Sequence, residues 1–223
     1  MSDRPELVVW DFDGTLADTR TAILAAARYA LESHGYPVPV DDDVTALVGL
    51  PIHELYGRLA GGPGERVVAD LAESHRSHFE SNAAAVTTLF DGIVELLVDL
   101  AGAGVPSAVA TSRTWRTLGP LMAHLRLTEH VAAVRTGDAM TNPKPAPDMV
   151  LELCAELGVA AGDAIVVGDT AFDVEMGRRA GATTCGVTWG NHGEDELAAA
   201  GADHVVHDVR SLAPLLFDRS GIT

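Results

Sequence analysis

The chain has 223 residues, of which 47% are hydrophobic and 21% are charged, and its formal net charge is −17. This apolar content excludes a mainly disordered chain. The length fits one α/β domain, or a domain of roughly 150 residues that carries a smaller insert. An acidic surface repels phosphate backbones, so we expect no nucleic-acid partner.

Cysteine usage and hydropathy favour a reducing, aqueous compartment. Cys154 and Cys185 are far apart, and each lies among apolar residues, as buried free thiols do. No apolar run approaches the roughly 20 residues of a membrane span. An apolar strand-like run begins already at Leu7, which leaves no room for a signal peptide. We therefore expect a cytoplasmic protein with no membrane partner.

Short apolar runs that stop at polar residues predict the strands of a parallel sheet. In chain order they lie at residues 7–10, 105–110, 131–134, 164–168, 183–187 and 204–206. Helical patterns lie at residues 93–101, 115–125, 148–157, 172–180, 194–200 and 211–217. This alternation predicts an α/β fold with a doubly wound, Rossmann-like parallel sheet covered by helices on both faces.

Residues 16–88 break the alternation, because they carry three or four helical stretches and no convincing strand. One apolar stripe spans residues 23–31, a short helix opens at residue 41, another follows Pro51, and the last spans residues 65–82. We therefore predict an α/β core of residues 1–15 and 89–223 with an inserted helical cap subdomain of residues 16–88. The hinges are expected at residues 16–18 and 86–89.

Two pairs of aspartates follow two of the predicted strands. Asp11 and Asp13 follow the first strand on one side of an extended segment, and Asp169 and Asp173 follow the strand at residues 164–168. Either pair alone would also suit a turn or a helix N-terminus. Ligands in open α/β sheets bind beyond the carboxyl ends of the strands, where all four fall. Together they form an oxygen-rich environment suited to Mg²⁺.

Two further motifs supply groups that suit an anion. Lys144 is the only lysine of the chain, and prolines on both sides of it restrict the local backbone. Thr111 and Ser112 end another predicted strand, where a hydroxyl and backbone N–H groups can hold phosphate oxygens. Taken singly, the first also fits a rigid loop before a helix, and the second fits a helix N-cap.

In this order, the D-x-D-G-T, Thr-Ser, Lys-Pro and G-D-T-x-x-D motifs resemble the haloacid dehalogenase-like hydrolase superfamily, over nearly the whole chain. Residues 201–206 are similar to the ends of its phosphoglycolate phosphatase-like members. The resemblance implies an enzyme of the phosphoric monoester hydrolase type. Its substrate would be a small-molecule phosphate ester, with phosphoglycolate as the leading candidate, and its cofactor Mg²⁺.

The resemblance also implies roles for single residues. Asp11 would attack phosphorus to form an aspartyl-phosphate, and Asp13 would protonate the leaving alkoxide and later activate water. Thr111 would bind the phosphoryl group together with the backbone of Ser112, and Lys144 would offset negative charge.

Metal ligation is implied in the same way. Asp11, the backbone carbonyl of Asp13 and Asp169 would hold Mg²⁺, and Asp173 would support that site directly or through water.

Alternatives remain at this point. A β-phosphoglucomutase-like mutase usually has valine where this chain has Thr15, and a mutase carries a basic cap-loop residue that residues 48–51 lack. An inorganic pyrophosphatase of the same branch stays open. A phospho-accepting, receiver-like signalling domain is remote, since receivers are about half this length and have no helical insert.

Substrate specificity and assembly are left open by the sequence. The cap residues His53, Glu54, Tyr56 and Arg58 are candidates for contacting the substrate. A homodimer is compatible with the sequence, which contains no exposed apolar pattern that decides it. The histidines His75 and His78 share one face of a predicted helix, and we expect this face to be solvated.

Overall fold

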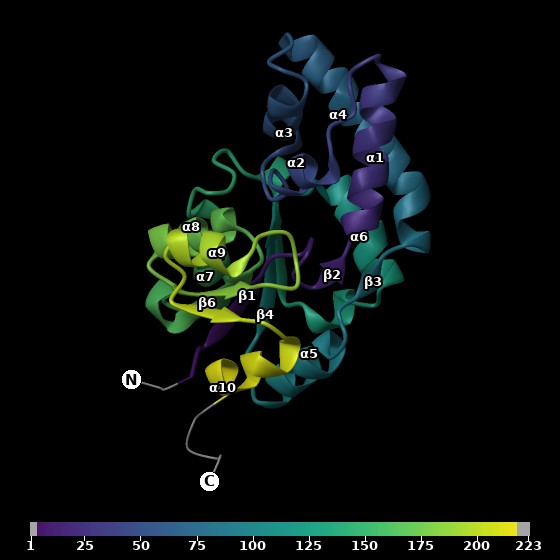
Figure 1. Ribbon diagram of the computed structural model, residues 1–223. Helices are drawn as coiled ribbons and strands as arrows, with labels where there is room; N and C mark the ends of the chain where they lie inside the picture. The colour runs from purple at the N-terminus through teal and green to yellow at the C-terminus, as the bar shows by residue number, and fades with distance from the viewer. Residues whose placement is uncertain (1–3, 218–223) are drawn as a thin grey trace.

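The structure is a computed structural model that describes residues 4–217. Its centre is a six-stranded parallel sheet with the strand order β5-β4-β1-β6-β7-β8 (Figure 1). The strands are β1 (Leu7–Trp10), β4 (Ser107–Thr111), β5 (Ala133–Thr136), β6 (Ala164–Gly168), β7 (Thr183–Val187) and β8 (His204–Val206). The predicted α/β fold with a doubly wound parallel sheet is thereby confirmed.

Strand β1 lies in the middle of the sheet, and its four residues are completely buried. Val9 is in register with Ala108 of β4 on one side and with Val166 of β6 on the other. The chain runs outward from β1 through β4 and β5, and then crosses back to β6. The carboxyl end of β1 is therefore the switch point of the sheet, where open α/β sheets bind their ligands.

Helices cover both faces because the residues of β1 alternate between them. Val8 and Trp10 pack in one apolar cluster with α5 (Ile93–Gly102), α6 (Trp115–His124) and α10 (Ala213–Leu216). Leu7 and Val9 pack in another with α7 (Asp148–Leu157) and α8 (Ala171–Ala180). The remaining helix of this part is α9 (Glu194–Ala199). The 3₁₀ turns are η1 (Ala83–Ala85), η2 (Thr128–His130), η3 (Gly137–Ala139), η4 (Ala161–Asp163) and η5 (Val209–Leu212).

Three predicted elements differ from the structure by more than one residue. β4 begins at Ser107 rather than Val105, because Pro106 has no backbone N–H to donate to a ladder. β5 lies two residues later than predicted. Its ladder with β4 pairs Ala133 with Ala108 and ends where Thr136 pairs with Thr111. The helix predicted at residues 211–217 is the 3₁₀ turn η5 followed by α10, whose first turn contains Pro214.

Four helices are inserted between β1 and α5, namely α1 (Arg20–Ser33), α2 (Asp41–Thr45), α3 (Ile52–Leu59) and α4 (Glu65–Asn82). In Figure 1 they stand above the carboxyl ends of the sheet. The chain enters them through β2 (Ala17–Asp18) and leaves through β3 (Thr88–Leu89). These strands pair antiparallel, so the expectation of no strand in this segment was wrong. Two residues are too few to show an alternating pattern.

The inserted helices have an apolar cluster of their own, which includes Leu31, Tyr56 and Leu71. Tyr56 of this cluster shares a 2.8 Å hydrogen bond with the side chain of His75. His75 is buried, so the expectation of a solvated face is wrong for this residue. His78 is half-buried and packs against the ring of Tyr29.

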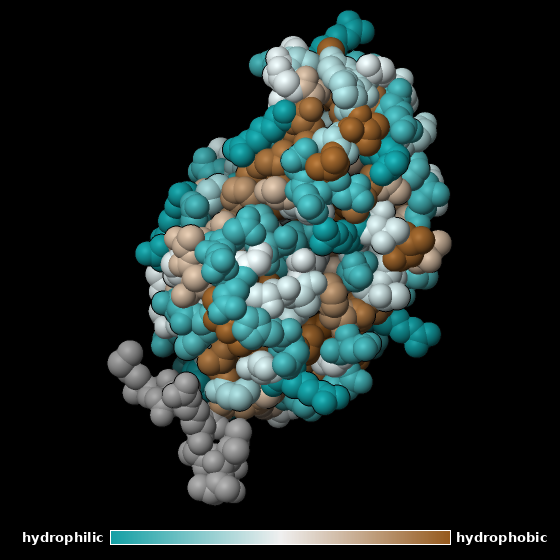
Figure 2. Space-filling view, in the orientation of Figure 1, coloured by the Kyte–Doolittle hydropathy of each residue, from teal (hydrophilic) through white to brown (hydrophobic). Residues whose placement is uncertain are grey.

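The surface is mostly hydrophilic on the face that Figure 2 shows, with apolar residues in scattered patches. Both cysteines are buried and free. Among the helices of residues 4–217, none combines the length and the apolar character that crossing a membrane requires.

Candidate active site

Asp11 follows directly on β1 and occupies the switch point of the sheet. Its backbone N–H donates to the carbonyl of Val167, which extends the ladder to β6 by one residue. Its side chain is 7% exposed. Burial raises the pKa of Asp11 well above its usual value, Lys144 opposes this rise, and the other aspartates nearby add to it. The position therefore holds more negative charge than its protein neighbours balance.

Lys144 is the cation that faces Asp11. It lies in the loop before α7, and only 2% of it is exposed. Its Nζ is 2.5 Å from Asp11 Oδ1 and 2.5 Å from Asp173 Oδ1. Burial alone would lower the pKa of Lys144, but the two carboxylates raise it above its usual value. The side chain is therefore a fixed positive charge between the end of β1 and the first turn of α8.

Asp169 follows β6 and is held by a set of hydrogen-bond donors. Thr15 Oγ1 donates to Oδ1 at 3.1 Å, and the backbone N–H and side-chain amide of Asn191 donate to Oδ2 at 2.7 and 2.8 Å. Burial and the charge of Asp173 raise the pKa of Asp169 to about 7, against the lowering effect of these hydrogen bonds. A Cβ at Gly14 or Gly190 would clash with its carboxylate, so both glycines leave room for it.

The two carboxylate oxygens of Asp173 accept hydrogen bonds from different groups. Its Oδ2 accepts from the backbone N–H of Thr170 at 3.0 Å and from the Thr170 hydroxyl at 2.6 Å, which forms a capping box at the start of α8. Its Oδ1 accepts from Lys144. The capping role that the sequence left open therefore coexists with a place in the site.

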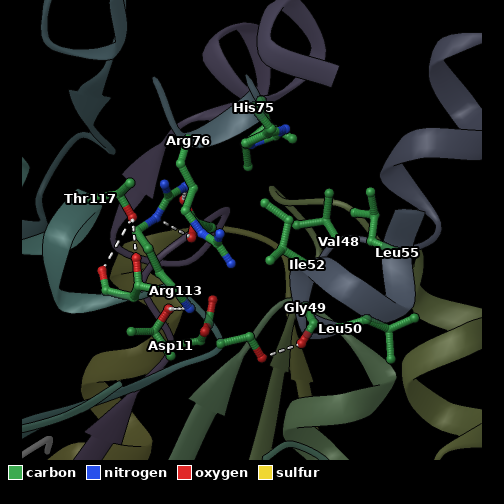
Figure 3. Close-up of a pocket in the computed structure, with 15 residues that line it drawn as sticks. Asp11, Val48, Gly49, Leu50, Ile52, Leu55, His75, Arg76, Arg113 and Thr117 are labelled. Carbon is green, nitrogen blue, oxygen red and sulfur yellow. Dashed lines mark hydrogen bonds and ion pairs between the residues drawn. The ribbon is translucent and has the colours of Figure 1, made fainter. Parts of the chain in front are cut away.

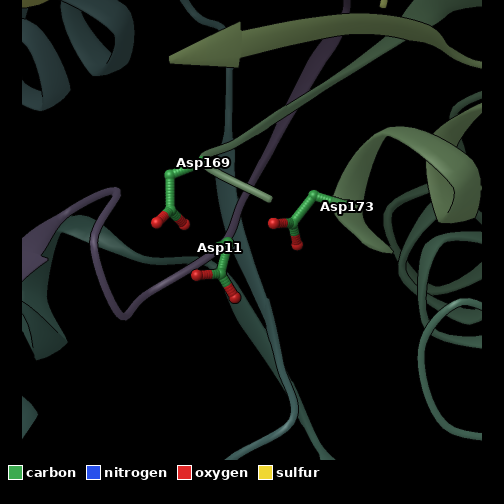
Figure 4. A group of neighbouring side chains, drawn as sticks. All are labelled: Asp11, Asp169 and Asp173. Carbon is green, nitrogen blue, oxygen red and sulfur yellow. The ribbon is translucent and has the colours of Figure 1, made fainter. Parts of the chain in front are cut away.

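Asp11, Asp169 and Asp173 form a buried carboxylate cluster in which one oxygen of each residue lies within 4.8 Å of the others (Figure 4). Hard divalent cations such as Mg²⁺ take oxygen ligands of this kind. One lysine cannot balance three buried carboxylates; burial and, after it, the charges of the neighbouring aspartates raise the pKa of Asp11. The residues thus fit a divalent cation on their donor chemistry and on their charge.

Asp13 points away from this cluster, toward the pocket. Its carboxylate accepts from Arg113 Nε at 2.9 Å and Nη2 at 2.5 Å, and from the Thr19 hydroxyl at 2.7 Å. The Arg113 guanidinium lies 3.9 Å from the centre of the Phe79 ring, which belongs to α4. Arg113 therefore contacts both the sheet end and the inserted helices.

Thr111 and Ser112 follow β4, on the other side of Asp11. The Thr111 side chain is buried, and its Oγ1 accepts from the backbone N–H of Arg113 at 3.2 Å. The Ser112 hydroxyl donates to the carbonyl of Gly49 at 2.5 Å. Gly49 has φ +99°, and a Cβ there would press on Thr170 Oγ1 at 2.9 Å. The loop before α3 thus rests directly on the strand ends.

All seven predicted site residues gather at this edge of the sheet, although they span positions 11 to 173. A pocket opens beside them, lined on the sheet side by Asp11, Asp13 and residues 111–114 (Figure 3). From the inserted helices it is lined by Val48, Leu50, Ile52, Leu55, His75 and Arg76, among others. None of the four cap candidates, His53, Glu54, Tyr56 and Arg58, lines it.

Sequence reasoning missed three residues of the site. Arg113 directly follows the Thr-Ser pair, so its position next to a strand end was a usable signal. Asn191 lies in a Gly-rich turn after β7, where an amide side chain alone has no distinctive pattern. Arg76 lies on a helix whose charged residues resemble an ordinary solvated face.

Comparison with known proteins agrees with this geometry. The family model described as haloacid dehalogenase-like hydrolase matches residues 8–187. The chain belongs to this family, and it is a phosphatase of the family. In the solved structure of a haloacid dehalogenase-like hydrolase from Bacteroides fragilis, the same fold recurs with a TM-score of 0.89, at 22% identity over 94% of this chain and 100% of that one.

Several curated relatives carry phosphatase names, whereas "Tyrosine-protein kinase PtkA" of Mycobacterium tuberculosis is 32% identical over 92% of this chain and 69% of its own. "Probable phosphatase IndB" of Dickeya dadantii is 35% identical over 87% of this chain and 86% of its own. The N-acetylmuramic acid 6-phosphate phosphatase of Pseudomonas aeruginosa is 32% identical over 96% and 95%. The phosphoglycolate phosphatase of Agrobacterium fabrum is 29% identical over 98% and 96%.

Proposed function

We propose that the protein is a Mg²⁺-dependent phosphatase that hydrolyses small-molecule phosphate monoesters through an aspartyl-phosphate intermediate. The observation that carries this proposal is the placement of Asp11. It lies in the buried carboxylate cluster and also lines the pocket, with Lys144 at 2.5 Å. An anion can approach such a carboxylate only where positive charge has first reversed the local field.

The two half-reactions follow from the positions of Asp11 and Asp13. A carboxylate oxygen of Asp11 attacks phosphorus, the bond from phosphorus to the ester oxygen breaks, and Asp13 gives the departing alkoxide its proton. Asp13 then takes a proton from water, and the water oxygen attacks phosphorus of the aspartyl-phosphate. Inorganic phosphate leaves, and the Asp11 carboxylate is regenerated.

The other residues hold charge and position. Lys144 offsets the negative charge of Asp11 and of the phosphoryl oxygens, and Thr111 binds those oxygens together with the backbone at Ser112. Asp11, the backbone carbonyl of Asp13 and Asp169 would hold Mg²⁺, with Asp173 in support. The bound cation would supply neutralisation of the charge that develops on the transferred phosphoryl group.

Residues 16–88 act as a cap over a catalytic core of residues 1–15 and 89–223 in this proposal. Three features support it: these residues line one side of the pocket, the Ser112 hydroxyl donates to the carbonyl of Gly49, and both crossings of the chain lie side by side in β2 and β3. Closure of such a segment excludes water and selects substrates. Hinge motion would then concentrate at residues 16–18 and 86–89.

Phosphoglycolate is the leading substrate candidate. The similarity to the Agrobacterium phosphoglycolate phosphatase over almost the full length of both chains supports it. The N-acetylmuramic acid 6-phosphate phosphatase relative makes a sugar phosphate the second candidate.

A phosphate-release screen tests the proposed function. The substrates are phosphoglycolate, N-acetylmuramic acid 6-phosphate, hexose phosphates and pyrophosphate, each with Mg²⁺ and with excess EDTA. We expect Mg²⁺-dependent, continuous release from at least one monoester. Release from pyrophosphate alone, or conversion of a hexose phosphate without release, would contradict hydrolysis of monoesters. Uptake of a single phosphate without turnover would indicate a phospho-accepting signalling domain instead.

A further inference from the structure

Arg76 is a second cation of the pocket, contributed by the inserted helix α4. It lines the same cavity as Asp11 and Asp13. In Figure 3 its side chain extends into that cavity, between Val48 and Ile52 on one side and Arg113 on the other. The end of this side chain therefore faces the space that the alcohol portion of a phosphate ester would occupy.

The two carboxylates Asp13 and Glu73 are already paired with other cations. Arg113 holds Asp13 through two hydrogen bonds of 2.9 and 2.5 Å. Glu73, the acid nearest Arg76, is held by Arg116 Nη1 at 2.7 and 2.9 Å, whereas its distance to Arg76 Nη1 is 3.8 Å. The positive charge of Arg76 is therefore only weakly compensated within the protein.

The hydrogen-bond donors of Arg76 are also incompletely used. Its side chain is 17% exposed, and its Nε is buried without a hydrogen-bond partner. Nη2 is 3.3 Å from Nε2 of His53. Burial and the charge of Arg76 lower the pKa of His53, and an imidazole supplies no negative charge to Arg76. A largely buried guanidinium with one long ion pair and an unpartnered Nε can still take an anion, and a ligand in the pocket can supply it.

The walls of the pocket limit what that ligand is. Val48, Leu50, Ile52 and Leu55 are aliphatic and offer no side-chain polar groups. A single guanidinium matches a planar monoanion, which it binds through two parallel hydrogen bonds. A second phosphate group would carry a charge of about −2 and more acceptor oxygens than one arginine can satisfy.

We propose that Arg76 is a specificity residue that binds a carboxylate on the alcohol portion of the substrate. The inference rests on the proposed phosphatase function and narrows it to phosphate monoesters of hydroxy acids. The phosphoryl group is held at the sheet edge, and the carboxylate is held by the inserted helices.

A pair of substrates tests this without any mutation. Phosphoglycolate and 2-hydroxyethyl phosphate differ only in a carboxylate that replaces a hydroxymethyl group. We expect kcat/KM of the wild-type enzyme to be about 10- to 100-fold higher for phosphoglycolate, the range that a charged hydrogen-bond pair supports. A bisphosphate of similar length should be a poorer substrate than phosphoglycolate.

Variants then assign the effect to Arg76. Arg76→Gln should lower kcat/KM for phosphoglycolate about 10- to 100-fold and leave 2-hydroxyethyl phosphate within about twofold. Arg76→Lys keeps the positive charge but loses the two parallel N–H donors, so its kcat/KM for phosphoglycolate should lie between those of the wild type and Arg76→Gln. Arg66→Gln, an exposed arginine on the same helix, is the matched control and should behave as wild type. Thermal unfolding midpoints identify any variant that fails to fold.

The outcomes separate this inference from the proposed function. If no phosphate ester is hydrolysed, the proposed function fails. If both esters are hydrolysed equally well, or if Arg76→Gln lowers both rates to the same extent, the phosphatase assignment stands and the role of Arg76 is wrong. If the bisphosphate is preferred and the preference depends on Arg76, the bound group is a phosphate and the carboxylate assignment is wrong.

Discussion

Lys144 shows why a residue type matters at this site. Its Nζ lies 2.5 Å from the carboxylate of Asp11, after β1, and 2.5 Å from that of Asp173, in the first turn of α8, in a space with almost no solvent. A compact ammonium can occupy this position, whereas a planar guanidinium needs more room and a different geometry. Removing the charge leaves buried carboxylates facing one another, which is unfavourable both for the fold and for an approaching anion.

Replacement of Lys144 should therefore abolish activity even when charge is kept. We expect Lys144→Ala and Lys144→Arg each to lower the initial rate of phosphate release by about 100-fold or more. Arg28→Ala, which removes an exposed ion pair with Asp41, is the control and should retain the wild-type rate. Substantial activity in both Lys144 variants would show that the loop before α7 has only a structural role.

The two aspartates after β1 should respond differently to the same isosteric change. Asp11→Asn removes the nucleophile, so phosphate release should stop and no aspartyl-phosphate should form. Asp13→Asn removes the proton donor, so release should fall by about 10²- to 10⁴-fold. Rates and acid-quenched phosphoprotein are measured together with thermal midpoints. Near-normal turnover of Asp11→Asn would contradict the nucleophile assignment.

Helices α4 and α6 show how the inserted helices are attached to the sheet. Arg116 of α6 donates to Glu80 from Nε at 2.6 Å and Nη2 at 2.7 Å, and to Glu73 from Nη1. Both acids belong to α4, so one exposed arginine connects the two parts of the chain at two points. Such exposed ion pairs are weak, and salt screens them. They suit a contact that opens and closes.

Loss of this contact should change substrate capture rather than chemistry. We expect Arg116→Gln to raise KM between about 1.5- and 5-fold with kcat within twofold, because the closed arrangement is less favoured. In 0.5 M NaCl the KM of the wild-type enzyme should rise by the same factor, because salt screens the ion pairs, whereas the KM of the variant should rise less. Steady-state kinetics at two salt concentrations measure this. If the KM of both proteins rose equally with salt, the ion pairs of Arg116 would be excluded as the origin of the salt effect.

At the scale of the whole molecule, the carboxyl edge of the sheet was predictable because its residues follow apolar runs. The positions of β1, β6, β7 and β8 agree with the sequence pattern, and Asp11 and Asp169 follow two of these strands. The contacts across the pocket were not predictable. Arg76 and Asn191 reach the site through tertiary packing, and no local pattern distinguishes them from surface residues.

His75 should make the stability of the whole molecule depend on pH. Burial, together with the charges of Arg113 and Arg76, lowers the pKa of His75 to about 3 from its usual 6.5. Between these values the unfolded chain binds a proton that the folded chain does not. Stability contributed by His75 is therefore present above pH 6.5 and is lost as the pH falls, by about 1.4 kcal/mol per pH unit.

Denaturant unfolding at pH 7 and pH 5 measures this effect. His75→Gln should reduce the loss of stability between the two by about 2 kcal/mol relative to the wild type. His204→Gln, a half-buried residue on β8, serves as the control. An unchanged pH dependence in His75→Gln would show that His75 is not the group responsible.

The pairing of β2 with β3 brings the two ends of residues 19–87 next to each other, since Asp18 is in register with Thr88. Hydrogen bonds between these strands close a long excursion of the chain at its base, and the cost of such closure grows only slowly with length. Segments of other lengths and sequences can therefore be grafted at this junction while β1 keeps its neighbours. The chemistry at Asp11 and the choice of substrate above it can then evolve separately.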